Sequence, residues 1–131
     1  ARFGDAGRWD AFEVVKLKRW GKGRVAILGD AAHAMPPYLG QGGGCALMNG
    51  LALADAVGAA DDIPQALERW EERERPLTEH TQDTAERLGD MNFWPDDIRS
   101  QVLKITGQSP EIGAIRMRTA RHVPTAADFD V

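Results

Sequence analysis

The chain has 131 residues, a length typical of a single domain, and a formal net charge of −4. Acidic and basic residues are interspersed, which argues against a nucleic-acid partner because nucleic-acid-binding proteins usually present a basic face. No apolar run approaches the roughly 20 residues that cross a bilayer, and the first residues lack a signal-peptide pattern. The single cysteine, Cys45, excludes an internal disulfide and fits a reducing compartment. We therefore expect a cytoplasmic protein that binds neither nucleic acid nor membrane.

Two extended segments are predicted near the N-terminus. Residues 12–20 (FEVVKLKRW) roughly alternate apolar and polar side chains, which predicts a half-exposed strand. The glycines of residues 21–23 (GKG) predict a turn. Residues 25–28 (VAIL) form a continuous apolar run, which is typical of a strand buried on both faces.

A strand buried on both faces needs a neighbouring strand at each edge, because its backbone N–H and C=O groups require partners. After residue 44 the sequence predicts only helices and loops. The missing strands are therefore expected on a partner chain or on sequence outside these residues, and we favour the second explanation.

Helices are predicted for the rest of the chain. Residues 42–60 are small, apolar and almost uncharged, which predicts a buried helix. Residues 61–89 form an amphipathic segment, with Asp62 at a cap position and Pro64 in the first turn.

Proline and serine positions predict where the later helices begin and break. Pro76 lacks the N–H that a helix interior needs, so we expect a kink or break near Arg75. Two shorter helices are predicted over residues 93–107 and 109–122, each with proline near its start.

Residues 29–44 combine an acid, two prolines and a glycine-rich segment directly after the second predicted strand. Ligands of open α/β sheets bind at the carboxyl ends of strands, where Asp30 either accepts hydrogen bonds from the hydroxyls of a polyol or caps the next turn. Residues 40–44 (GQGGG) open a helix whose unpaired N–H groups suit an electron-rich ligand, although a flexible loop is the alternative. Pro36 and Pro37 form either a flat wall against a planar ring or an ordinary rigid turn.

Residues 24–42 (RVAILGDAAHAMPPYLGQG) resemble the second FAD-binding motif of flavin-dependent aromatic hydroxylases of the p-hydroxybenzoate hydroxylase type. Residues 12–20 more loosely resemble the last strand of the substrate domain in that family, and residues 66–76 (ALERWEERERP) resemble a helix that usually follows. The resemblance implies an α/β fragment: one or two strands of a Rossmann-like FAD-binding domain followed by three to four helices, helix-rich overall.

The resemblance implies a role for most residues of this motif. Asp30 is expected to bind the ribityl hydroxyls of FAD, and Pro36 and Pro37 are the expected catalytic positions, lining the flavin ring near its oxygen-reacting edge and the substrate. Backbone N–H groups at the helix start are expected to stabilise negative charge on the reduced flavin, whereas His33 is expected to pack and orient the loop. The implied cofactor-binding residues are Gly29, Asp30, Ala31, Pro37, Gly40, Gln41, Gly42, Gly43 and Gly44.

The resemblance covers only the C-terminal part of such an enzyme. The family opens with a GxGxxG segment that holds the ADP part of FAD, and no GxGxxG occurs in this sequence. That N-terminal part is therefore an implied partner. The implied division is residues 1–22 for the end of the substrate-domain sheet, 23–60 for the FAD-binding strand, loop and helix, and 61–131 for a helical region.

Several other residues are expected to serve packing rather than chemistry. Cys45 is either a thiolate favoured by the helix dipole or a packed small residue, and we favour the second. The histidines lack metal-ligand spacing, so no metal site is expected. Trp70 and Trp94 are predicted core aromatics, although Phe93 and Trp94 alternatively face a substrate or another subunit. The family usually has Asn where this chain has Gly44, which removes a helix cap.

The leading hypothesis is the C-terminal part of a flavin-dependent monooxygenase that hydroxylates an aromatic substrate with NAD(P)H and O₂. Residues 1–131 are not expected to be active alone. One alternative is another FAD-dependent oxidoreductase (a reductase, epoxidase or halogenase) with the same motif. The other is a non-catalytic helical interaction fragment that holds no flavin.

Overall fold

The computed structural model describes residue 7 and residues 10–122. A short antiparallel hairpin, β1 (Gly21–Lys22) and β2 (Val25–Ala26), comes first. The helices that follow are α1 (Asp30–His33), α2 (Gly42–Gly58), α3 (Ile63–Asp90), α4 (Asp96–Gly107) and α5 (Pro110–Arg116), with 3₁₀ turns η2 (Pro37–Leu39), η3 (Met91–Phe93) and η4 (Thr119–Arg121). The expected helix-rich α/β class is confirmed.

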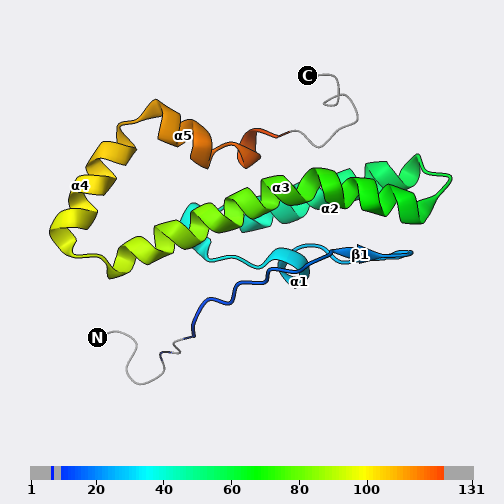
Figure 1. The fold of residues 1–131 in the computed structure, drawn as a ribbon, viewed down its shortest axis with the longest axis horizontal. Helices are drawn as coiled ribbons and strands as arrows, with labels where there is room; N and C mark the ends of the chain where they lie inside the picture. Colours follow the sequence, from blue (N-terminus) through cyan, green and yellow to red (C-terminus); the bar gives the residue numbers. More distant parts are fainter. Residues whose placement is uncertain (1–6, 8–9, 123–131) are drawn as a thin grey trace.

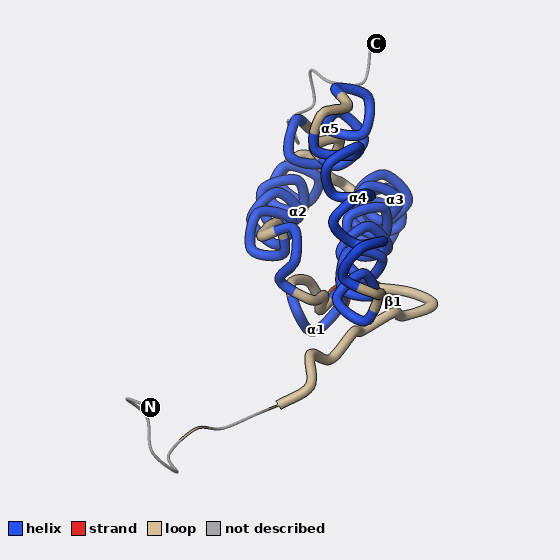
Figure 2. Tube along the Cα trace, turned by 90° about the vertical axis from the view of Figure 1, so that its left-hand side faces the viewer, coloured by secondary structure: helices blue, strands red, loops and turns tan. Residues whose placement is uncertain are grey.

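Helices α2 and α3 form an antiparallel pair that runs along the length of the molecule (Figure 1). The hairpin, α1 and residues 10–20, which we together call the hairpin layer, lie along one side of this pair (Figure 1, Figure 2). Helix α5 lies on the opposite side. The loop from α1 to α2 therefore lies at the junction between the hairpin layer and the helix pair.

The hairpin layer corrects both strand predictions. Residues 12–20 form no regular strand. The carbonyls of Val15, Leu17 and Lys18 accept from side chains of α3. The carbonyl of Trp20 accepts from the N–H of Ile27 at 2.9 Å. Residues 25–28 form a strand only over Val25–Ala26. Ile27 and Leu28 are 38% and 37% exposed, so this segment is not buried on both faces by the described residues. The predicted turn is shifted: Gly21 and Lys22 form β1, and the chain turns at residues 23–24, with Gly23 at φ +60°.

The core lies where the hairpin layer meets the helix pair. The ring centroids of Trp20 and Trp70 are 5.7 Å apart, and the Trp70 indole N–H donates to the carbonyl of Asn49 at 3.0 Å. The prediction that Trp70 is a core residue is confirmed. Trp94 is 40% exposed, so the same prediction for Trp94 is wrong.

Helix α3 begins as predicted and continues further than predicted. The Asp62 carboxylate accepts from the N–H of Gln65 at 3.1 Å, with Pro64 in the first turn. The expected break near Arg75 is wrong, because α3 passes through Pro76 without interruption. Buried side chains occur on both sides of this proline, and their packing offsets the roughly 3 kcal/mol that an interior proline costs a helix.

The last two helices begin close to the predicted positions, but α5 ends at Arg116 rather than at the predicted residue 122. Helix α4 ends at Gly107, and Ser109 caps α5 by accepting from the N–H of Ile112 at 3.2 Å. Neither helix contains a fully buried residue. Among residues 7 and 10–122, no helix is long and apolar enough to cross a membrane.

Candidate functional site

The turn after β2 exposes the carboxylate of Asp30. Gly29 has φ +65° and ψ −149°, a conformation that side-chain-bearing residues rarely adopt, and its carbonyl accepts from the N–H groups of Ala32 and His33 at 2.9 Å each. Asp30 is exposed, and no described residue makes a hydrogen bond or ion pair with its carboxylate. A Cβ added at Gly29 would lie 3.7 Å from the Cβ of Ala46, so α1 begins beside the first turns of α2.

The N-terminus of α2 also has unused polar groups. Gln41 provides no side-chain cap, and the first helical N–H to find an acceptor is that of Cys45, which donates to the Gln41 carbonyl at 2.9 Å. The N–H groups of residues 42–44 therefore have no helical acceptor. A Cβ at Gly43 or Gly44 would meet nothing within 4 Å, so the packing of the chain leaves open space there.

Together these features form a surface that we call the α1–α2 wall, comprising residues 29–31 and 40–44. Its carboxylate accepts hydrogen bonds from hydroxyl groups, and its uncapped helix start donates to electron-rich atoms and favours negative charge. The two halves lie side by side, since a Cβ added at Gly29 would reach van der Waals distance of Ala46.

Gln41 differs from the other wall residues because its amide is already engaged. Its Nε2 donates to the carbonyl of Arg116 at 3.0 Å, which ties the end of α5 to the start of α2. Its Oε1 is buried without a hydrogen-bond partner among the described residues.

The two prolines lie in different surroundings. Pro36 is buried and lines a groove of about 700 Å³, whereas Pro37 is exposed and begins η2. Three aromatic side chains also line the groove: Phe12, Tyr38 and Phe93.

His33 is fully buried in the core rather than presented to a ligand. Its Nε2 lies 3.0 Å from the Nδ2 of Asn49, which also donates to Thr78 Oγ1 at 3.1 Å. Burial lowers the pKa of His33 below its usual value. The imidazole is therefore neutral at pH 7 and accepts from Asn49, an arrangement that serves packing.

Cys45 is also a packed residue, 1% exposed. Burial raises the pKa of its thiol above the usual value. This direction argues against the thiolate alternative. In the part of the chain that the structure describes, no group of three His, Cys, Asp or Glu residues is arranged to hold a metal ion.

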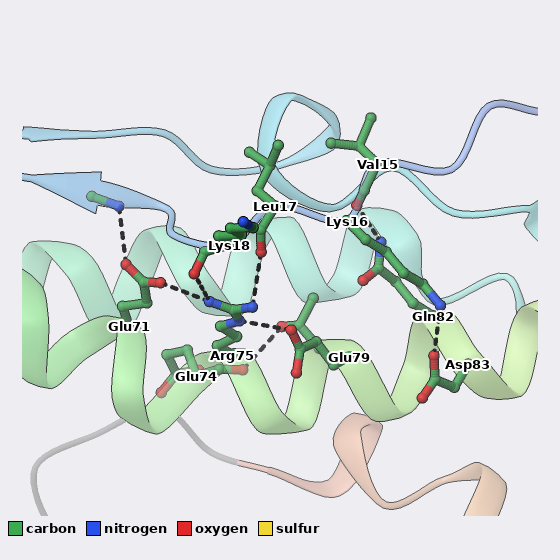
Figure 3. A network of polar contacts seen from close by, with 12 residues as sticks. Val15, Lys16, Leu17, Lys18, Glu71, Glu74, Arg75, Glu79, Gln82 and Asp83 are labelled. Carbon is green, nitrogen blue, oxygen red and sulfur yellow. Dashed lines mark hydrogen bonds and ion pairs between the residues drawn. The ribbon is translucent and has the colours of Figure 1, made fainter.

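No pattern in the sequence indicates the residues of α3 that bind the segment before the hairpin. The guanidinium of Arg75 donates to the carbonyls of Leu17 and Lys18 at 2.8 and 2.5 Å (Figure 3). The amide of Gln82 donates to the carbonyls of Val15 and Ala34 at 2.8 and 3.0 Å. In sequence both residues resemble solvated positions on an amphipathic helix.

Comparison with known proteins points to one family. A family model described as an FAD binding domain matches residues 5–85. The chain is 44% identical over 120 residues to a probable 2-heptyl-3-hydroxy-4(1H)-quinolone synthase of Rhodococcus erythropolis, covering 92% of this chain and 31% of that protein. It is 37% identical over 83 residues to a salicyloyl-CoA 5-hydroxylase of a Streptomyces species, covering 63% of this chain and 16% of that protein.

Comparison with solved structures also finds an oxygenase. A crystal structure of a mutant of 2-methyl-3-hydroxypyridine-5-carboxylic acid oxygenase matches with a TM-score of 0.71 and 32% identity. The match covers 89% of this chain and 28% of that one. The chain thus spans about a third or less of the length of these relatives.

Proposed function

The chain belongs to the FAD-binding domain family, and on that premise we propose that it is the C-terminal part of a flavin-dependent monooxygenase that hydroxylates an aromatic substrate. NAD(P)H is the proposed reductant and O₂ the proposed oxidant. Two of its relatives, a quinolone synthase and a salicyloyl-CoA hydroxylase, support an aromatic substrate by their names.

One observation supports this proposal most strongly: the α1–α2 wall combines an unpartnered carboxylate with an uncapped, side-chain-free helix start. These groups fit FAD. Asp30 matches a polyol such as the ribityl chain, and the open N–H groups of residues 42–44 match the pyrimidine edge of the flavin. Asp30, Gly43 and Gly44 are exposed, so their polar groups can also bond to water. The support comes from their convergence on one surface, within the residues that match the FAD-binding domain.

When bound, FAD supplies the redox chemistry, and the residues of this chain bind and orient it. We assign to Asp30 the role of accepting hydrogen bonds from the ribityl hydroxyls. We assign to residues 42–44 the stabilisation of negative charge at the pyrimidine edge by their N–H groups and the helix dipole. Pro36 and Pro37 have no N–H to offer and form a rigid surface that excludes water beside the ring.

Apolar side chains exposed on β2, on the two residues after it and on α2 support the proposal that further sequence completes the FAD site. Five of them are 37–78% exposed: Val25, Ile27, Leu28, Leu47 and Leu51. We propose that an N-terminal part with a GxGxxG segment covers them. In the proposed division residues 1–22 end the substrate-domain sheet, residues 23–60 form the second FAD-binding motif and residues 61–131 form a helical region. Residues 1–6, 8–9 and 123–131 of this division lie outside the described residues. The proposed location is the cytoplasm.

A flavin absorption spectrum of the full-length protein tests the proposal. We expect bound FAD, as purified or after reconstitution, and NAD(P)H oxidation that a 2-alkyl-4-quinolone or a hydroxylated aromatic acid stimulates. Oxygen from ¹⁸O₂ is expected in the product. A colourless protein that FAD does not reconstitute would contradict the proposal, and flavin reduction without oxygen transfer to any substrate would assign the protein to another oxidoreductase class.

A further inference from the structure

We propose that α3 positions the Pro36–Pro37 loop through two contacts, a hydrogen-bonding clamp at Gln82 and a side-chain-free seat for Tyr38 at Gly89. This inference rests on the proposed function, because the proposed role of the loop is to line the flavin. It names positioning residues that lie outside the FAD-binding motif and that the sequence does not reveal.

The loop needs to be held from outside because it has few hydrogen-bond donors of its own. Pro36 and Pro37 have no backbone N–H. Within η2 the only backbone bond closes from the N–H of Gly40 to the Pro37 carbonyl at 3.0 Å. Contacts from α3 therefore hold the loop at the carbonyl of Ala34, before the prolines, and at the side chain of Tyr38, after them.

Gln82 fixes the loop on the side before the prolines. Its side chain is 1% exposed, and its Nε2 donates to the carbonyls of Ala34 and Val15 at 3.0 and 2.8 Å. The same Ala34 carbonyl accepts from the N–H of Val15 at 3.1 Å. A single buried amide thus joins α3, the segment before the hairpin and the residue two positions before Pro36. Figure 3 shows this amide reaching the Val15 carbonyl from α3.

Gly89 fixes the loop on the side after the prolines. A Cβ at Gly89 would lie 2.5 Å from Cε2 and 2.9 Å from Cδ2 of Tyr38, closer than real Cβ contacts allow. The tyrosine ring therefore rests directly on the helix backbone. Phe12 contacts the same ring in a T-shaped arrangement, with centroids 6.0 Å apart and planes at 79°.

The two contacts act together because they lie on one face of one rigid helix. Gln82 and Gly89 are seven residues apart, which is about two helical turns and roughly 10 Å along the axis. Both residues are buried, and α3 is continuous between them. The loop is thus held at Ala34 and at Tyr38, with both prolines between the two points.

The experiment compares two substitutions with two matched controls in the full-length protein. Gln82→Leu removes both donors at similar volume, and Gly89→Ala displaces the Tyr38 ring. The controls are Gln101→Leu, an exposed glutamine of α4, and Gly113→Ala, a helical glycine whose added Cβ meets nothing within 4 Å. Two quantities are measured: hydrogen exchange of residues 34–41 without flavin, and the FAD dissociation constant with the absorption spectrum of the bound flavin.

We expect both substitutions, and neither control, to speed exchange of residues 34–41 by about tenfold and to weaken FAD binding by a similar factor, since each removes an interaction of about that size. The visible spectrum of the remaining bound flavin should shift. Adding Gly89→Ala to Tyr38→Ala should neither speed the exchange of residues 34–41 nor weaken FAD binding further, because the ring that the new methyl group displaces is already absent.

Unchanged hydrogen exchange of residues 34–41 in both variants would overturn the two contacts. A Gly89→Ala effect on exchange that is equally large with and without the Tyr38 ring would overturn the contact at Gly89. Faster exchange with unchanged FAD binding and spectrum would overturn the positioning role. A wild-type protein that binds no FAD would contradict the proposed function instead, while the exchange of the loop would still test the two contacts.

Discussion

The α1–α2 wall and the inner face of α3 are both rich in polar groups, but they use them in opposite ways. Along α3, Arg75 and Gln82 donate to backbone carbonyls of the preceding layer, and Glu71 accepts from the N–H of Gly21 at 3.0 Å. On the wall, the Asp30 carboxylate and the first N–H groups of α2 have no partners among the described residues. The paired groups of α3 hold the two layers together, whereas the groups on the wall stay available to water or to a ligand.

Arg75→Met provides the largest expected effect on the α3 side of this comparison. The substitution removes two charge-assisted bonds to the carbonyls of Leu17 and Lys18 and the ion pair with Glu79, so we expect a loss of about 3 kcal/mol in the free energy of unfolding. Urea denaturation measures it. Arg69→Met, which removes only a bond to Gln65 within the same helix, is the control. Equal losses in the two variants would show that Arg75 does not hold the layers together.

Gly89→Ala tests the close contact between α3 and the loop, because its effect on the free energy of unfolding should change sign when the Tyr38 ring is removed. In the wild-type background the new methyl group meets the Tyr38 ring, and overpacking of this kind costs about 2 kcal/mol. In the Tyr38→Ala background the same substitution should stabilise the protein by about 0.5 kcal/mol, because alanine favours helices over glycine. Thermal and urea denaturation of the four variants measure the cycle. A loss in both backgrounds would contradict the contact.

The buried His33 predicts how stability depends on pH. Its pKa in the folded protein lies below the ordinary value of 6.5, so the unfolded chain takes up a proton first as the pH falls. Its contribution to stability is present above pH 6.5 and is lost as the pH falls below that value, by at most about 1.4 kcal/mol per pH unit. Urea denaturation at several pH values between 7.5 and about 5 measures the free energy of unfolding, which should depend less steeply on pH in His33→Gln than in the wild-type protein. Identical slopes would contradict this assignment.

Gly44→Asn, which introduces the residue usual in the family, should have the smallest effect. A side chain at Gly44 meets nothing within 4 Å, so we expect the free energy of unfolding to change by less than about 0.5 kcal/mol and FAD binding to be retained or tightened. Gly42→Asn is the matched comparison, because its Cβ would lie 3.4 Å from Met35 Cγ and should cost more. Similar losses in both variants would show that the wall is not open at this point.

Local signals in the sequence were sufficient to predict where helices α3 and α5 begin. Asp62 with Pro64, and Ser109 with Pro110, form caps that use groups within a few residues, so their pattern predicts them directly. The prediction of a strand over residues 12–20 was wrong because three of its carbonyls, those of Val15, Leu17 and Lys18, bond to side chains of α3 more than 50 residues away. The break expected at Pro76 failed for a related reason, since tertiary packing on both sides keeps α3 continuous.

The candidate site was partly predictable in the same sense. The positions of Asp30 and the glycines follow from a short motif, and the structure presents Asp30 exposed and the start of α2 uncapped. Their roles toward FAD stay predictions. The contact between Gly89 and Tyr38 joins residues about 50 positions apart, and no local pattern signals it.

The FAD dissociation constant of Asp30→Ala tests the central claim, that the α1–α2 wall is a flavin surface, most directly. The full-length variant should bind FAD about 10- to 100-fold more weakly while its free energy of unfolding without flavin is unchanged, because the carboxylate has no partner within the described residues. Asp55→Ala, an exposed acid on α2, should bind FAD like the wild-type protein. Wild-type affinity in Asp30→Ala, or a loss of equal size in Asp55→Ala, would contradict the account.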